Sequence, residues 1–201
     1  MNKHALRWAA CAALVFAASS AVAADMALPA PVQTGGMPLN EALANRKTIR
    51  KMDRERELTP EHLSGLLWAS NGFNRSAKRT APTARNKQEL ELIVLLPSGA
   101  YAYDARANKL VQMSEENLLP VAESFGTAEI LIVADRNKQI NDQYNAVDSG
   151  FIGQNAYLYA ASEGLAAVFR GAVDRDALHS KLNLGGDKTI TYTISVGYPA
   201  K

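Results

Sequence analysis

A dense group of cations with one hydroxyl side chain occurs at Arg46–Lys51, which reads Arg-Lys-Thr-Ile-Arg-Lys. A guanidinium group presents a planar fork of donors to phosphate oxygens, and a threonine hydroxyl can donate one more hydrogen bond. The segment therefore suits a phosphate-bearing ligand. Three acidic residues follow between positions 53 and 57, so a solvated, charged stretch of surface is the alternative interpretation.

Two further segments could face a ligand. Arg79–Gln88 reads Arg-Thr-Ala-Pro-Thr-Ala-Arg-Asn-Lys-Gln, which is rich in hydrogen-bond donors and has a proline to restrict the backbone. At Gly164–Gly171 a predicted helix gives way to a short strand, where backbone N–H groups can point at a ligand. The alternative for this last segment is a simple helix cap.

The signatures of several other chemistries are absent from the sequence. It has no Gly-x-Ser-x-Gly elbow, no Walker loop, no Gly-x-Gly-x-x-Gly and no His-Glu-x-x-His. Cys11 is the single cysteine and lies in the predicted leader, and His62 and His179 are far apart in the chain. We therefore expect no metal site and no thiol nucleophile.

The N-terminus has the pattern of a secretory signal peptide over residues 1–24. A short basic start precedes an apolar run from Trp8 to Ala18 and the small residues of Ala21–Ala24. The run is shorter than the 20 or so residues of a spanning helix, and the residues before Cys11 make a poor lipidation site. We expect export, to a bacterial periplasm, without a stable membrane anchor.

Composition and charge are those of one globular domain. The 201 residues are 47% hydrophobic and 21% charged. Of 22 Lys and Arg residues, Lys3 and Arg7 lie in the leader, which leaves 20 cations against 20 acidic residues. A balanced chain of this kind is a poor candidate for binding nucleic acid.

Helices and strands are mixed along the mature chain. Residues 25–38 are rich in Ala, Pro and Gly and predict a flexible N-terminal arm, followed by one domain over 39–201. The pattern predicts helices over Leu39–Asn45, from Thr59 to Asn71, over Glu115–Phe125 and Gln143–Glu163, and over Asp174–Leu182.

Strands are expected at Leu90–Leu96, Ala100–Asp104 and Lys109–Met113, which form a β-meander, and at Ala128–Ala134, Leu165–Val168 and Thr189–Val196. Asn74–Lys87 is predicted to be a long polar loop. The order of elements indicates an α+β domain.

In this order the three segments resemble the nitroreductase-like flavoprotein family. The match runs through Arg-Lys-Thr-Ile-Arg, then Leu-Leu-Trp-Ala-Ser-Asn-Gly-Phe-Asn-Arg, then the Arg79–Gln88 segment, and closes at Ser-Val-Gly-Tyr-Pro. It covers about Leu39 to Pro199. Within the family the sequence is most similar to the branch whose members oxidise azoline rings in peptides, and to small exported relatives.

The resemblance implies an α+β fold with a central, mainly antiparallel sheet flanked by helices, which forms a homodimer with FMN at the interface. It implies that one group of residues binds the FMN phosphate, ribityl chain and pyrimidine edge: Arg46, Lys47, Thr48 and Arg50. A second group would reach the flavin of the neighbouring subunit: Pro82, Thr83, Ala84 and Asn86. A third would pass near flavin N5: Phe169, Arg170 and Gly171. Lys201 would supply a C-terminal phosphate cation.

The sequence departs from the family pattern in several places. Thr48 and Thr83 stand where serine is usual, and the segment at Phe169 is one residue shorter than in bacterial nitroreductases. The mature chain is also shorter than typical members, so its substrate is not inherited from a relative.

Three functions follow as alternatives. The first is an exported FMN-dependent oxidoreductase that reduces a nitro, quinone or similar acceptor by ping-pong chemistry, with an unknown electron donor and catalytic residues that the sequence does not identify. The second is a non-catalytic protein that binds a flavin or another ligand. The third is binding to an anionic surface through a basic patch, which would be formed by Arg75, Lys78, Arg79, Arg85 and Lys87.

Overall fold

The structure is a computed structural model that describes residues 25–139 and 141–201. A seven-stranded sheet forms its centre, in the order β1-β6-β5-β4-β7-β9-β8, and every neighbouring pair is antiparallel. The strands are β1 (Met26–Ala27), β4 (Leu90–Leu96), β5 (Gly99–Asp104), β6 (Lys109–Ser114), β7 (Ala128–Asp135), β8 (Ala166–Arg170) and β9 (Lys188–Gly197). The predicted α+β class, antiparallel sheet and β4-β5-β6 meander are confirmed.

Four helices accompany the sheet: α1 (Leu39–Asn45), α2 (Pro60–Asn71), α3 (Asp142–Ser162) and α4 (Arg175–Lys181). The helices α2, α3 and α4 each begin at a side chain that caps the first turn, whereas α1 begins at Pro38 without such a cap. The Thr59 hydroxyl accepts the His62 N–H at the start of α2, and the Asn141 side chain does the same for the first turn of α3. After α3 the chain turns at Gly164, whose φ of +66° favours glycine.

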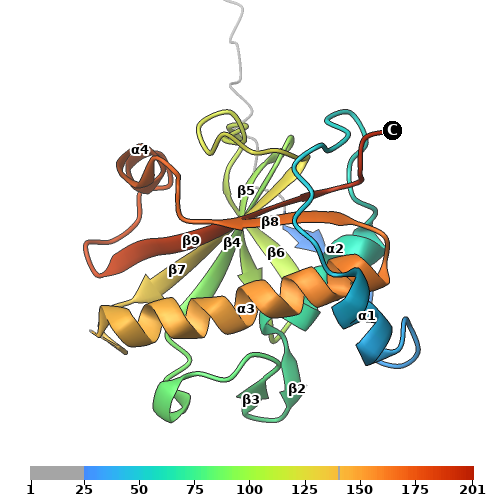
Figure 1. The fold of residues 1–201 in the computed structure, drawn as a ribbon. Helices are drawn as coiled ribbons and strands as arrows, with labels where there is room; N and C mark the ends of the chain where they lie inside the picture. Colours follow the sequence, from blue (N-terminus) through green and yellow to red (C-terminus); the bar gives the residue numbers. More distant parts are fainter. Residues whose placement is uncertain (1–24, 140) are drawn as a thin grey trace, which may run out of the picture.

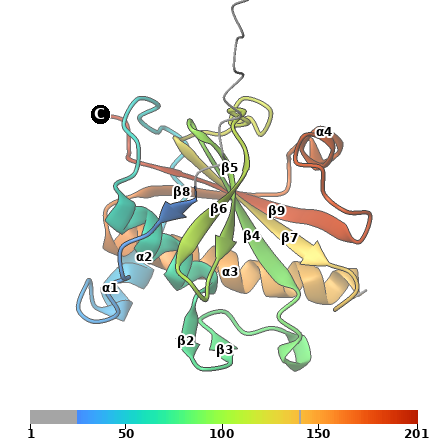
Figure 2. The same ribbon diagram turned by 180° about the vertical axis from the view of Figure 1, so that it is seen from behind.

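The sheet has a hydrophobic core on each face. One core joins α2 and α3 to the sheet through residues such as Leu66, Ile152 and Ile130. The other packs α4 and residues 115–125 against the opposite face, around Leu131 and Leu178. In Figure 1, α3 crosses below the sheet and α4 lies above it, and Figure 2 shows the same arrangement from behind. Because both faces of β7 are covered, all eight of its residues are buried.

The prediction of a helix over Glu115–Phe125 is wrong, since the structure has only turns there. Pro120 lacks the N–H that a helix interior requires. The Asn117 side chain accepts the Leu119 N–H instead, and Glu123 has a φ of +49°, which no α-helix contains. The apolar side chains still face the sheet, which is why the pattern resembled a helix.

The prediction of an irregular loop over Asn74–Lys87 is wrong in part. The structure has a hairpin of β2 (Phe73–Arg75) and β3 (Lys78–Arg79), then a 3-10 turn at Ala84–Asn86. Both strands are too short to show alternation in the sequence.

The N-terminal arm differs from the expected free segment at its beginning. Met26 and Ala27 pair with β6, and the Leu28 N–H donates to the Asn108 carbonyl at 3.2 Å. The predicted signal peptide over 1–24 lies outside the described residues. Within the described part of the chain, no helix is both long enough and apolar enough to cross a membrane.

Candidate functional site

The cationic segment that follows α1 is held against α3 and β8. The Ile49 N–H donates to the Ala167 carbonyl at 3.2 Å, and the Thr48 hydroxyl lies 3.0 Å from the Tyr157 hydroxyl. The Arg46 guanidinium lies over the Tyr157 ring, 5.3 Å from its centroid. The backbone of the segment is therefore fixed while most of its side chains face outward.

Tyr157 joins two of the segments that the sequence singled out. Its hydroxyl accepts the Phe169 N–H at 2.9 Å and can donate to Thr48. The structure thus brings residues 46–50 and the end of β8 together, although more than a hundred positions separate them. Sequence reasoning missed Tyr157, because it belongs to no motif. The one signal that could have identified it is its position on the side of α3 that faces residues 46–50.

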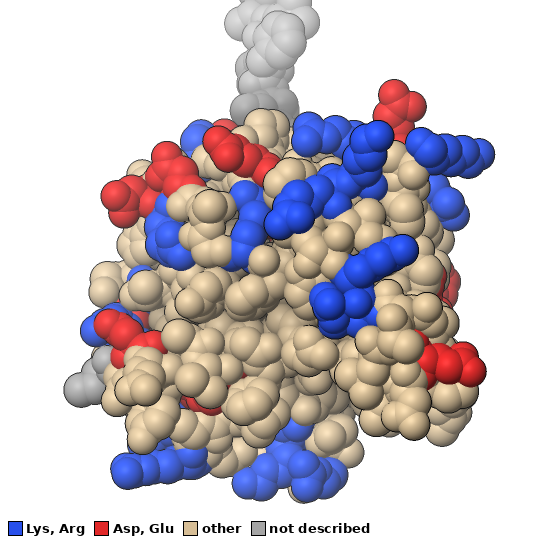
Figure 3. Space-filling model, in the orientation of Figure 1, with Lys and Arg blue, Asp and Glu red and all other residues tan. Residues whose placement is uncertain are grey.

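The cations of this segment are available for a ligand. Lys47, Thr48 and Arg50 are exposed and Arg46 is half-buried. In the part of the chain that the structure describes, none of the three cations pairs with a carboxylate. Figure 3 shows that the centre of the face that carries α3 is largely free of charged side chains, with Lys and Arg above and below it.

The C-terminus lies next to the same segment. The Asp53 N–H donates to the Tyr198 carbonyl at 2.9 Å, and the Ala200 N–H donates to the Lys51 carbonyl at 3.1 Å. The pKa of Asp53 is lowered mainly by the backbone N–H groups that its side chain accepts, and Lys201 lowers it further. Lys201 is therefore placed close enough to add its charge to that of residues 46–51.

The end of β8 sends its side chains to opposite faces of the sheet, as a strand must. The Phe169 ring faces α3 and stacks on Tyr192 with centroids 4.9 Å apart. The Arg170 guanidinium lies on the other face, where it donates to the Glu129 carboxylate at 3.0 Å and to the Ala122 carbonyl. Gly171 lines a hollow of about 370 Å³ together with Tyr192.

The second predicted segment, Pro82–Asn86, lies farther along α3. The Ala84 N–H donates to the Asp148 carboxylate at 2.8 Å, and the Thr83 hydroxyl accepts the Gln88 N–H at 2.9 Å. Asp148 precedes Tyr157 by nine residues, or about 13 Å along a helix. Within one chain this segment therefore does not meet residues 46–50.

A buried carboxyl group lies beneath this second segment. Glu89 is fully buried, and its carboxyl group lies next to that of Asp148. Burial, and secondarily the nearby Asp148 carboxyl, raise the pKa of Glu89 to about 7. Near neutral pH this side chain is therefore poised between its neutral and charged forms.

The junction at Tyr157 has the chemistry that a flavin mononucleotide requires. It offers unpaired cations and a hydroxyl group for a phosphate, next to an aromatic side chain and the half-buried end of β8. The residues present therefore fit this group. In contrast, no cluster of three or more potential metal-binding side chains exists within residues 25–139 and 141–201.

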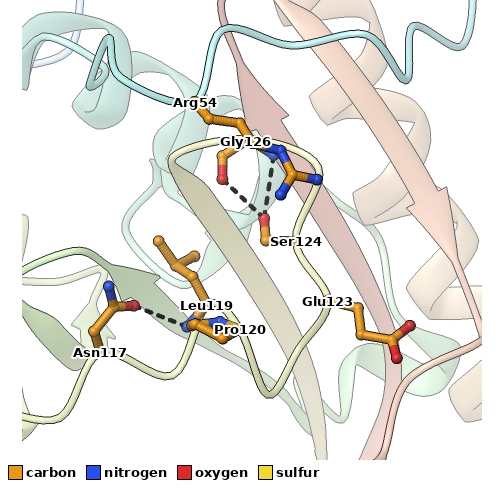
Figure 4. Close-up of a pocket in the computed structure, with 7 residues that line it drawn as sticks. All are labelled: Arg54, Asn117, Leu119, Pro120, Glu123, Ser124 and Gly126. Carbon is orange, nitrogen blue, oxygen red and sulfur yellow. Dashed lines mark hydrogen bonds between the residues drawn. The ribbon is translucent and has the colours of Figure 1, made fainter.

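A separate pocket of about 420 Å³ lies beside residues 117–126, as Figure 4 shows. Its polar groups are largely occupied locally, since Asn117 accepts the Leu119 N–H and the Ser124 hydroxyl hydrogen-bonds to Gly126. Arg54 and Glu123 are the charged residues in its lining. The pocket includes none of the residues that the sequence singled out.

Comparisons with known proteins agree with this geometry. The model of the nitroreductase family matches residues 43–198. A crystal structure of a protein from Ralstonia eutropha JMP134, named as a nitroreductase, is 33% identical and has a TM-score of 0.83, with 88% of this chain and 90% of that chain covered. None of the curated proteins compared with the chain matches it.

Two other solved structures have the same fold at lower identity. One, named as an NADH oxidase from Clostridium acetobutylicum, is 26% identical with a TM-score of 0.56, covering 80% of this chain and 88% of that one. The other, named as a nitroreductase in complex with FMN from Desulfovibrio desulfuricans, is 22% identical with a TM-score of 0.61, covering 83% and 89%. By its sequence and its fold, the chain belongs to the nitroreductase family of oxidoreductases.

Proposed function

We propose that the protein is an exported, FMN-dependent oxidoreductase that reduces a nitro, quinone or similar acceptor by ping-pong chemistry. The observation that carries the proposal is the junction of Arg46, Thr48, Tyr157 and Phe169, which places unpaired cations beside the end of β8, the last strand of the sheet. FMN, when bound, supplies hydride transfer. The FMN in the Desulfovibrio relative supports this choice of cofactor.

The roles of the chain's own residues follow from their placement. Arg46, Lys47 and Lys201 hold the phosphate, while Thr48 is oriented by Tyr157 and presents its hydroxyl group to the ligand. Arg50 would supply a positive charge to the bound ring system and would stabilise negative charge on it. The electron donor is a substrate that the chain does not identify, and the azoline-oxidising branch stays a prediction.

The choice of the group that faces flavin N5 can be narrowed among Phe169, Arg170 and Gly171. Ala167 and Phe169 direct their backbone polar groups away from β9, toward Ile49 and Tyr157 respectively. Gly171 directly follows the end of β8, two positions beyond Phe169. The Phe169 N–H is already occupied by Tyr157, so we assign Gly171 to the flavin.

The active unit is a homodimer that forms through α1 and α3. Large apolar side chains are exposed on both helices, including Leu39 at 63% and Val147 at 51%, with Phe151 one turn beyond Val147. Large exposed apolar side chains on two helices of one molecule favour an interface. Pairing two chains here allows the Pro82–Asn86 segment of each to reach the site of the other.

A flavin titration tests the proposal. Purified mature protein is titrated with FMN, and the quenching of flavin fluorescence gives the Kd. Arg46→Ala and Arg50→Ala should each weaken binding at least about tenfold, the loss of one charge-assisted contact of about 1.4 kcal/mol. Lys181→Ala, on α4, is the matched control and should leave the Kd unchanged. Equal affinity in all four proteins would contradict the assignment.

Turnover and assembly are tested separately. Reduction of the bound flavin by a donor, followed by reoxidation by a nitro compound or quinone, is the result that the proposal expects. A protein that retains FMN but is reduced by no donor would be a non-catalytic flavin-binding protein. Val147→Glu should convert a dimer into a monomer in sedimentation and weaken FMN binding. A wild-type monomer that binds FMN would contradict the shared site.

A further inference from the structure

A cleft lies between the β2–β3 hairpin and the segment that follows it. Its volume is about 350 Å³. The polar side chains in its lining are Arg75, Lys78, Arg79, Thr80, Thr83 and Asn86. It is separate from the Tyr157 junction of the same chain, because Asp148, which accepts the Ala84 N–H of this segment, precedes Tyr157 by about 13 Å along α3. The cleft therefore needs an explanation of its own.

Positive charge gathers in this cleft without compensation. Three cations and no acidic residue contribute to its lining as the structure describes it. Arg75 and Lys78 are exposed, and neither forms an ion pair with any described residue. Like charges held this close repel one another, so the arrangement favours an anion.

The third cation is held rigidly. Arg79 donates to the Asn71 carbonyl at 2.7 Å and lies over the Phe73 ring, 4.5 Å from its centroid. Arg106 approaches the same ring at 3.7 Å. Burial first, and then the charge of Arg106, lower the pKa of Arg79. A fixed guanidinium group is a better anchor for an anion than a mobile one, because less entropy is lost on binding.

The acidic side chains around the cleft do not line it: the Asp148 carboxylate accepts the Ala84 N–H at 2.8 Å, and Glu89 is buried with a raised pKa. Two more acidic side chains are engaged on the hairpin side. The Asp104 carboxylate accepts the N–H groups of Arg106 and Ala107 in the turn after β5. The Glu91 carboxylate binds the Lys188 ammonium at 2.9 Å. Neither contributes to the lining of the cleft, so neither neutralises Arg75 or Lys78 there.

The remaining polar groups supply further donors. The Thr83 hydroxyl accepts the Gln88 N–H, which leaves its own hydrogen to donate. The Asn86 side-chain oxygen accepts from Gln88, and its amide nitrogen makes no hydrogen bond among the described residues. A tetrahedral anion with several acceptor oxygens satisfies such a set of donors.

We propose that this cleft binds a phosphate group of a small ligand, held by Arg75, Lys78 and Arg79 with help from Thr83 and Asn86. The site shares Thr83 and Asn86 with the segment that is proposed to reach the partner's flavin, but its three cations belong to the β2–β3 hairpin, and their binding of phosphate does not require bound FMN. If FMN does bind between two subunits, the cleft lies beside the partner's flavin. A phosphate held there would then favour a phosphate-bearing electron donor or acceptor.

The test titrates mature protein that is free of FMN with orthophosphate and with pyrophosphate, at constant ionic strength. Calorimetry gives the Kd, and the amide NMR signals of residues 78–88 report the location. We expect saturable binding, with the largest shifts in this segment. A double variant, Arg75→Ala with Lys78→Ala, should weaken binding at least about tenfold. Both side chains are exposed, and an unchanged urea midpoint verifies that the variant folds.

The matched control removes the same charge next to the cleft. Arg85→Ala with Lys87→Ala deletes two exposed cations that do not line it, and should change the Kd less than about twofold. Equal losses in the two double variants would overturn the proposal in favour of a diffuse basic surface. So would binding to anionic lipid vesicles without saturable binding of either phosphate. Failure of FMN binding in the separate titration leaves this result unaffected.

Discussion

Removing the charge of Arg170 should destabilise the protein far more than an ordinary surface substitution. The Arg170 side chain is only 12% exposed, and its partner Glu129 is fully buried. Glu129 also accepts a short hydrogen bond of 2.5 Å from the Ser195 hydroxyl. In Arg170→Met the carboxylate loses its counter-charge but stays in the interior. Breaking a buried pair in this way costs about 3–5 kcal/mol.

Urea unfolding of the variant measures this cost directly. For a domain of this size, about 3–5 kcal/mol corresponds to a fall in Tm of roughly 6–20 °C. The double variant Arg170→Met with Glu129→Gln should recover most of the loss, because the uncompensated charge is gone. Arg50→Met, which removes an exposed cation, should cost less than about 0.5 kcal/mol. A cost below about 1 kcal/mol for Arg170→Met would refute the reasoning, and a selective loss of FMN binding would assign the guanidinium to the cofactor.

Three further predictions concern α3 and its neighbours. Because the pKa of Glu89 is raised to about 7, the stability that its neutral form contributes is present below about pH 4.5 and is lost as the pH rises through about 7. Glu89→Gln should therefore flatten the pH dependence of the urea midpoint, and an unchanged slope would contradict this. Gly153→Ala should lower the free energy of unfolding by about 1–3 kcal/mol, since a Cβ there would lie 2.4 Å from the Phe169 ring. Gly150→Ala, on the open side of the helix, should be neutral or stabilising by up to about 1 kcal/mol. Thermal melts that rank the two variants the other way would be inconsistent with this packing. Tyr157→Phe should weaken FMN binding about threefold to tenfold without a large change in Tm, because the hydroxyl contacts with Thr48 and Phe169 are lost. An unchanged Kd in fluorescence titration would count against Tyr157 as a positioning residue.

Local sequence rules predicted most of the secondary structure, because its signals are themselves local. The cap at Thr59 and the turn at Gly164 determine where α2 begins and where α3 ends, and the structure agrees at both. The segment 115–125 was mispredicted because its apolar side chains cover one face of the sheet as a helix would. Pro120 and the positive φ of Glu123 keep its backbone irregular.

The site was predictable only in part. The sequence identified the cations of residues 46–50 and the end of β8, but Tyr157 connects them through contacts distant in sequence. Whether Arg170 serves the ligand or the core depends on which face of the sheet its side chain takes. The face is determined by the buried Glu129, which lies in β7, two strands away from β8 in the sheet. No local sequence pattern shows this pairing. The roles of Pro82–Asn86 depend on a second chain and stay predictions.

The central claim is that the mature protein binds FMN at the Tyr157 junction. A visible absorption spectrum of the purified protein, recorded after incubation with FMN and desalting, tests it most directly. We expect a retained flavin spectrum at about one FMN per chain, and its loss in the variant that lacks the Arg46 and Arg50 guanidinium groups. A colourless wild-type protein that also fails to take up added FMN would contradict the account.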